Sequence, residues 1–159
     1  MQGRRYYVPF NRVAITAVQE LLEILAPADL MFTLEYFEVS QDSDAGDAQD
    51  EQLHFSIRRV TGSPTSGSGG STVTPAPLNP GDVASSCTCE ANNTTQLSGG
   101  TNTVLVPSCF NVRNGGIFLP PEIHQPMFSP STRCIIELEK APADSLTASG
   151  YGIICEYGG

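Results

Sequence analysis

The sequence predicts an all-β protein, an antiparallel jelly-roll-like β-sandwich with long loops. Short runs of alternating or β-branched and aromatic residues recur along the chain, and each run is bounded by Gly, Pro, Asn or Asp. The chain contains 15 Gly and 12 Pro, a density of turn residues that suits many short strands better than a helical bundle. Hydrophobic residues make up 40% of the 159 residues, which is enough for one core.

The first run, YYVPFNRVAIT, is rich in aromatic and β-branched residues. Residues 1–12 also carry a formal charge of +3 and no acidic residue, whereas the whole chain carries −9. We interpret residues 1–12 as a basic N-terminal arm that docks on an acidic protein surface. The side chains of this interface are Arg4, Arg5, Tyr6, Tyr7, Phe10 and Arg12. The alternatives are an ordinary solvated terminus and an integral strand from Tyr7 to Ile15.

Residues 16–26 fit two structures. Leu21 and Leu25 lie at helical spacing, but Leu22 and Ile24 also alternate as they would in a strand. One short helix in this region is therefore an alternative to a strand.

The next run, LMFTLEYFEVS, is a strand with two partly apolar faces. Alternation places Phe32, Leu34 and Tyr36 on one face, and Met31 and Phe37 on the other. Such a strand belongs inside a sandwich or an assembly. Further strands are predicted in LHFSIRRV, VASSCTCEA, TNTVLVPSCFNVR, GIFLPP, RCIIELEK and YGIICEY, for a total of about eight to ten.

The segment from Thr61 to Asp82 is a long loop of one domain. Of its 22 residues, 17 are Gly, Ser, Thr or Pro. Residues 1–60 and 83–159 each supply roughly four to six strands, too few for either part to close a sandwich alone. We therefore predict a single domain over residues 1–159. The prolines favour an extended segment, which suits contact with a neighbouring subunit.

The sequence offers little catalytic chemistry. Its two histidines, His54 and His124, stand beside no nucleophile motif, and GxSxG, HExxH, P-loop and GxGxxG patterns are absent. We expect no enzyme, no catalytic or metal site and no cofactor. The stretches YFE and FLPP are interpreted as core and not as sugar-binding platforms.

The acidic stretch from Asp42 to Glu51 does not match an EF-hand. A loop starting at Asp42 needs Gly at position 47 and Glu at position 53, where the chain has Asp47 and Leu53. A solvated connection between strands is the interpretation, with an irregular calcium loop as the alternative.

Charge and hydropathy also limit the partners. An acidic chain repels phosphate backbones, so nucleic acid is not expected. No apolar run reaches the length of a membrane span, and the first residues lack the apolar region of a secretory signal. The five cysteines are odd in number and form no CxxC motif, so we expect free, mostly buried thiols in a protein made in a reducing compartment.

Four stretches taken together resemble a known family. FNRVAITAVQELLEILAPAD, PLNPGD, CFNVRNGGIFLPPE and APADSLTASGYGIICEY look like small virion proteins of tailed bacteriophages, most of all the head-decoration, or cement, proteins. The resemblance covers most of the chain but rests on scattered stretches. It implies a homotrimer that is made in the host cytoplasm and binds the outside of the capsid over junctions of the major capsid protein, stabilising the head. The alternative is a fibre-tip or host-surface carbohydrate-binding domain.

Overall fold

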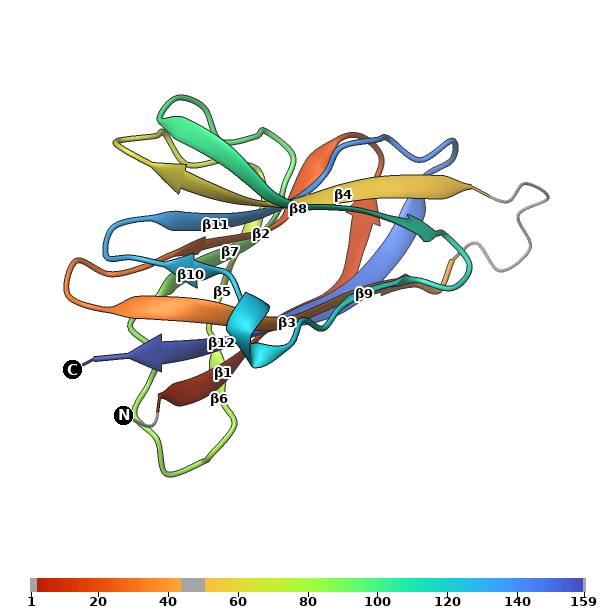
Figure 1. Ribbon diagram of the computed structural model, residues 1–159. Helices are drawn as coiled ribbons and strands as arrows, with labels where there is room; N and C mark the ends of the chain where they lie inside the picture. The colour runs from red at the N-terminus through yellow and green to blue at the C-terminus, as the bar shows by residue number, and fades with distance from the viewer. Residues whose placement is uncertain (1–2, 44–50, 159) are drawn as a thin grey trace.

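Two antiparallel sheets pack face to face in a computed structural model, which describes residues 3–43 and 51–158 (Figure 1). The predicted all-β sandwich is therefore confirmed. The described residues contain no α-helix, and their one helical turn is the 3-10 helix η1 (Glu122–His124). The chain passes repeatedly from one sheet to the other, so strands that are neighbours in sequence mostly lie in different sheets.

Sheet A contains both the first and the last strand of the described residues, β1 (Arg4–Ile15) and β12 (Leu146–Tyr157). Its strands, in spatial order, are β10 (Met127–Phe128), β3 (Met31–Gln41), β12, β1 and β6 (Ala76–Pro77), and β9 (Gly116–Phe118) also pairs with β3. The order in sheet B is β5 (Ser71–Val73), β7 (Thr88–Asn93), β2 (Gln19–Leu25), β11 (Arg133–Leu138), β4 (Gln52–Thr61) and β8 (Thr101–Asn111).

The helix alternative for residues 16–26 is wrong, because β2 is a central strand of sheet B. It pairs with β11 on one side and with β7 on the other, and six of its seven residues are buried. Leu22 and Ile24 point into the core between the sheets. A helix would bury one stripe, whereas a central strand with both faces covered buries nearly every residue.

A bulge in β3 changes which residues share a face. The pairing with β12 shifts between Ile153 and Ile154, so that Leu34 and Tyr36 stand opposite consecutive residues. Beyond the bulge, Phe37 points into the core and Tyr36 points out. The strand was predicted correctly, but its alternation holds for only half its length, because an extra residue reverses the two faces.

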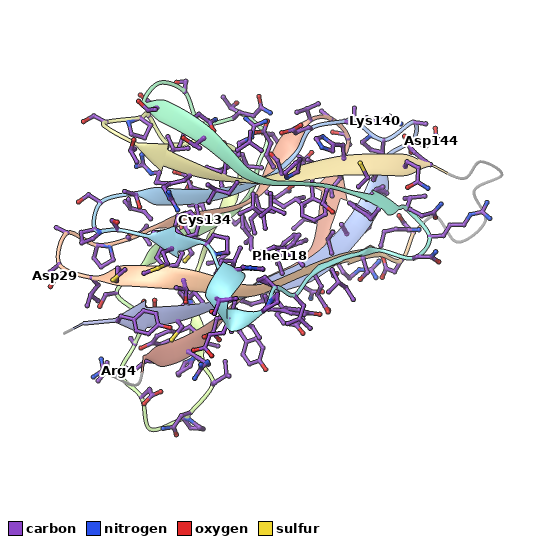
Figure 2. The ribbon with its side chains drawn as sticks, viewed as in Figure 1. Arg4, Asp29, Phe118, Cys134, Lys140 and Asp144 are labelled. Atoms are coloured by element: carbon purple, nitrogen blue, oxygen red, sulfur yellow. The ribbon has the colours of Figure 1, made fainter. Side chains whose placement is uncertain are left out.

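Four phenyl rings connect the sheets through the core. Phe10 lies 6.4 Å from Phe37, which lies 5.6 Å from Phe55, which in turn lies 5.9 Å from Phe110, measured between ring centroids. Phe10 and Phe37 belong to sheet A, and Phe55 and Phe110 to sheet B. Aromatic pairs of this kind add about 0.5–1.5 kcal/mol each beyond the burial of their area. Figure 2 shows the side chains that fill the space between the sheets.

The long segment after β4 stays on the sandwich along its course. Residues 62–70 lie beside residues 94–100, joined by antiparallel bridges between Thr65 and Ser98 and between Ser68 and Thr95 (Figure 1). The chain then pairs with the edge of sheet B through β5 and with the edge of sheet A through β6. This segment does not extend away from the sandwich as an arm. Its bridges, and the pairing of β5 and β6, join its backbone to other parts of the same chain.

Candidate functional site

The predicted basic arm is part of a sheet. Arg4 begins the 12-residue strand β1, which pairs with β12 and with β6. The alternative of an integral strand is thus what the structure shows, and a separate arm is wrong. The alternation of a strand separates Tyr6 and Phe10, which are core residues, from the exposed Arg5 and Tyr7. Arg4 is exposed as the first residue of the strand, and Arg12 is exposed at the bulge between Phe10 and Val13.

Arg5, Tyr7 and Pro9 of β1 belong to the outer face of sheet A, which we call the tyrosine face. Strand pairing arranges this face in rows across β3, β12 and β1. The three rows are Thr33–Cys155–Arg5, Tyr36–Ile153–Tyr7 and Glu38–Tyr151–Pro9. Apolar and aromatic side chains thus occupy the middle of the face, and charged ones lie beside them.

Three tyrosines pack together in the middle of the tyrosine face. The ring of Tyr151 lies 5.3 Å from that of Tyr36, in a stacked arrangement, and 5.4 Å from that of Tyr7, edge to face. The Tyr36 hydroxyl donates a hydrogen bond to Glu38. This hydrogen bond, together with burial, raises the pKa of Tyr36, so that its hydroxyl remains a donor at physiological pH.

The arginines beside these rings pair with carboxylates of their own chain. Arg5 Nε lies 2.7 Å from Glu35 Oε2, and this hydrogen bond raises the pKa of Arg5. Arg12 pairs with Asp42 at the far end of β1. These two arginines therefore border the tyrosine face as members of ion pairs and are not free charges waiting for an acidic partner.

An apolar corner adjoins the tyrosine face beyond β3. It consists of Ile117, Leu119, Ile123 and Met127, which are between 50% and 87% exposed and come from β9, the residue after it, η1 and β10 (Figure 1). Ile117 pairs with Glu38 and Met127 with Thr33, so the corner extends two rows of the face.

Sequence reasoning missed this corner. The FLPP stretch was interpreted as core, yet only Phe118 packs against the core, and Leu119 is 71% exposed. The signal was the three prolines within GIFLPPEIHQPMF, which exclude this run from the interior of a sheet.

The remaining candidate residues do not converge on the tyrosine face. His54 Nδ1 lies 2.7 Å from Glu139 Oε2 on sheet B, and His124 ends η1. Of the acidic stretch, Asp42 and Glu51 are described, whereas residues 44–50 lie outside the described residues. Within residues 3–43 and 51–158 no three His, Cys, Asp or Glu side chains are grouped as a metal site requires.

The cysteines are free, and four of the five are buried. Burial raises the pKa of Cys89 to about 12 and also raises the pKa of Cys87, Cys134 and Cys155. Thiols that stay protonated are poor nucleophiles, so these four act as small apolar side chains. Figure 2 labels Cys134, whose side chain lies between the sheets.

Comparisons add no relative to this description. The described part of the chain has no helix with the length and apolar character of a membrane span. Searches against protein-family models, curated proteins and solved structures found no match to this chain.

Proposed function

We propose that the protein is a non-enzymatic virion structural protein, a decoration protein that binds the outside of a phage head through the tyrosine face and stabilises the head. The observation that carries the proposal is the arrangement of this face, with clustered tyrosines in the middle and ion pairs at the border. Protein–protein interfaces have this composition, with aromatic residues in a centre that loses water and polar residues at a rim that keeps it. The partner in this proposal is the major capsid protein, which the resemblance to cement proteins implies.

The shape of the tyrosine face favours a large partner. The rows of Tyr36–Ile153–Tyr7 and Glu38–Tyr151–Pro9 run across three adjacent strands of one sheet, and a sheet presents an open surface, whereas small-molecule sites are concave. Binding then depends on burial of ring area more than on charge, because Arg5 already has Glu35 as its partner. Attachment should therefore persist in moderate salt.

Assembly as a homotrimer would multiply a weak contact. Three copies that bind together gain avidity without a strong individual interface. The apolar corner, with Ile123 87% exposed, is the surface that we assign to contacts between copies. Nucleic acid and membranes are not partners in this proposal.

The test is binding to phage heads that lack the protein. The double variant Y7S/Y151S should lose co-sedimentation with the heads, because it removes two of the three rings of the tyrosine cluster. The matched control is V104S, which alters a 50% exposed apolar residue on β8, far from the tyrosine face. Wild-type occupancy by Y7S/Y151S, in a protein shown to be folded, would contradict the proposal.

The same three tyrosines favour one second candidate, a host-surface carbohydrate-binding domain. Aromatic rings stack on the apolar faces of sugars, and Glu38 lies beside Tyr36 as an acceptor for sugar hydroxyls. Copy number separates the two candidates, because a decoration protein is present in hundreds of copies in each particle and a fibre tip in a few. Binding of host polysaccharide that Y7S/Y151S abolishes, with no binding to heads, would establish the second candidate.

A further inference from the structure

The outer face of sheet B carries a group of buried carboxylates. Glu20 and Glu23 of β2 and Glu137 of β11 are only 1%, 3% and 8% exposed. Residues 62–70 and 94–100 lie over them, and we call these two segments the cover. The cover also buries Val60 and Ile135, which are apolar residues outside the main core.

Each carboxylate holds the cover by one hydrogen bond. The Gly67 N–H donates to Glu23 Oε2 at 3.1 Å, and the Leu97 N–H donates to Glu20 Oε1 at 2.5 Å. The Gln96 amide donates to Glu137. The cover itself contains no charged residue. It therefore replaces water over the carboxylates without supplying any positive charge.

The cations beneath the cover are unevenly distributed. Arg133 Nε lies 3.0 Å from Glu23 Oε1, at an angle that makes an ion pair but no hydrogen bond. Arg58 Nη1 lies 2.9 Å from Glu137 Oε2. In the described part of the chain, Glu20 is bonded to neutral donors and takes part in no ion pair.

The titratable and charged groups around Glu20 come from four strands. They are Glu23 of β2, Glu90 of β7, Arg133 and Glu137 of β11 with Glu139 just after it, and His54 and Arg58 of β4. The side-chain nitrogen of Asn93 lies 3.1 Å from both Glu20 and Glu23, and 3.3 Å from Glu90. Carboxylates thus outnumber cations in this cluster.

The closed cover lies directly against Glu20 and shields it from bulk solvent. A Cβ atom at Gly67 would lie 2.5 Å from Glu20 Oε2 and 2.6 Å from the amide nitrogen of Asn93. An ionised carboxylate that is buried without a cation costs free energy, which is relieved when it takes up a proton or is hydrated. With the cover closed, Glu20 is shielded from bulk solvent, so uptake of a proton relieves this cost.

We propose that the cover is a proton-controlled element, closed when Glu20 is protonated and increasingly open as Glu20 ionises. Burial raises the pKa of Glu20, and Glu23 and Glu137 add to this effect, while the donors Leu97 and Asn93 oppose it. Burial likewise raises the pKa of Glu137, against the opposing effect of Arg58. Opening would expose Glu20, Glu23 and Glu137 on sheet B to solvent.

The sign of the pH dependence follows from the raised pKa. Between the ordinary value of 4.5 and the raised value, the closed form binds more protons than the open form. Closure is therefore favoured at the acidic end of this window and weakens as pH rises through it.

Hydrogen exchange of the folded protein, measured by mass spectrometry from pH 5 to 8, tests the proposal. Rates are divided by intrinsic rates to give protection factors. In wild type, the protection of residues 62–70 and 94–100 should fall at least severalfold across this range, while that of β11 stays constant. The variant E20Q places at position 20 a side chain that is neutral at every pH, so the cover should stay protected from hydrogen exchange at pH 8.

Two further variants serve as controls. E139Q changes a carboxylate that is paired with Arg58 and His54, and it should leave the slope of the cover's profile unchanged. G67A should lower the protection of the cover at every pH, because a Cβ atom at position 67 would clash with Glu20 and Asn93. A flat wild-type profile, or the wild-type slope in E20Q, would overturn the proposal; the wild-type measurement decides even if a variant does not fold.

Discussion

The ring of Phe10 lies against the backbone of Gly150, its partner across the β1–β12 ladder. A Cβ atom at position 150 would lie 2.7 Å from Phe10 Cζ and 2.1 Å from the carbonyl oxygen of Glu38. The contact joins the three longest strands of sheet A at one point. Only glycine permits it.

G150A is therefore expected to destabilise the protein by about 1–3 kcal/mol, because the ring and the β3 backbone must both move. Urea denaturation followed by circular dichroism measures the free energy of unfolding. The matched control is G81A, since the atom nearest to a Cβ at Gly81 is 3.6 Å away. This control should change stability by less than about 0.5 kcal/mol. Equal stability of the two variants would contradict the prediction.

Removal of residues 1–12 should unfold the protein. Tyr6, Val8 and Phe10 are core residues of β1, and loss of one buried aromatic side chain alone costs about 3–5 kcal/mol. Thermal melting followed by circular dichroism gives the result. The variant R5A/R12A removes two of the three arginines of residues 1–12 and keeps the strand, so it should melt cooperatively. A cooperative transition of the truncated protein would show that β1 is dispensable.

One thiol of five should react rapidly with a thiol reagent in the folded protein. Cys109 is exposed, whereas the other four are buried and their raised pKa keeps them protonated. Spectrophotometric counting without denaturant measures the reacting groups, and C109S should abolish the rapid phase. Rapid reaction of two or more thiols would disagree with the burial of these side chains.

Glu139 should stabilise the protein at neutral pH. Burial alone would raise its pKa, but the hydrogen bond from Arg58 and the charges of Arg58 and His54 lower the pKa below 4.5. A lowered pKa means that this stabilisation is present above 4.5 and is lost as pH falls through the folded value. The difference in stability between wild type and E139Q, measured by denaturation, should thus be largest at neutral pH and should shrink as the pH falls below 4.5. A difference that does not shrink with falling pH would exclude this electrostatic origin.

The alternation of apolar residues predicted the fold class because a sandwich buries one face of most strands. It failed in β3, where a bulge after Leu34 reverses the faces, and in β2, where Glu20 and Glu23 are buried by segments distant in sequence. A period of two cannot reveal an inserted residue or a cover. The inserted residue is visible only in the register of the paired strands, and the cover only in contacts between segments that are distant in sequence.

The candidate site was predicted in part. Tyr7 and Arg5 were identified from their charge and aromatic character, and both lie on the exposed face of sheet A. Their neighbours Tyr36 and Tyr151 could not be found, because strand register and not sequence distance brings them together. Charge counting suggested free arginines, whereas Arg5 and Arg12 are paired within the chain.

The pairing of β1 with β12 determines when this chain can fold during its synthesis. Arg4 stands opposite Glu156, so β1 leaves the ribosome long before its principal partner exists. At a synthesis rate of about 5–20 residues per second, β1 waits on the order of ten seconds for its principal partner. Its exposed edge is protected meanwhile by Pro9, which cannot donate a backbone hydrogen bond, and by Arg12, whose φ of 51° lies at the bulge that breaks the ladder. The nascent chain thus carries within β1 the features that keep an unpaired strand from aggregating until the last strand arrives.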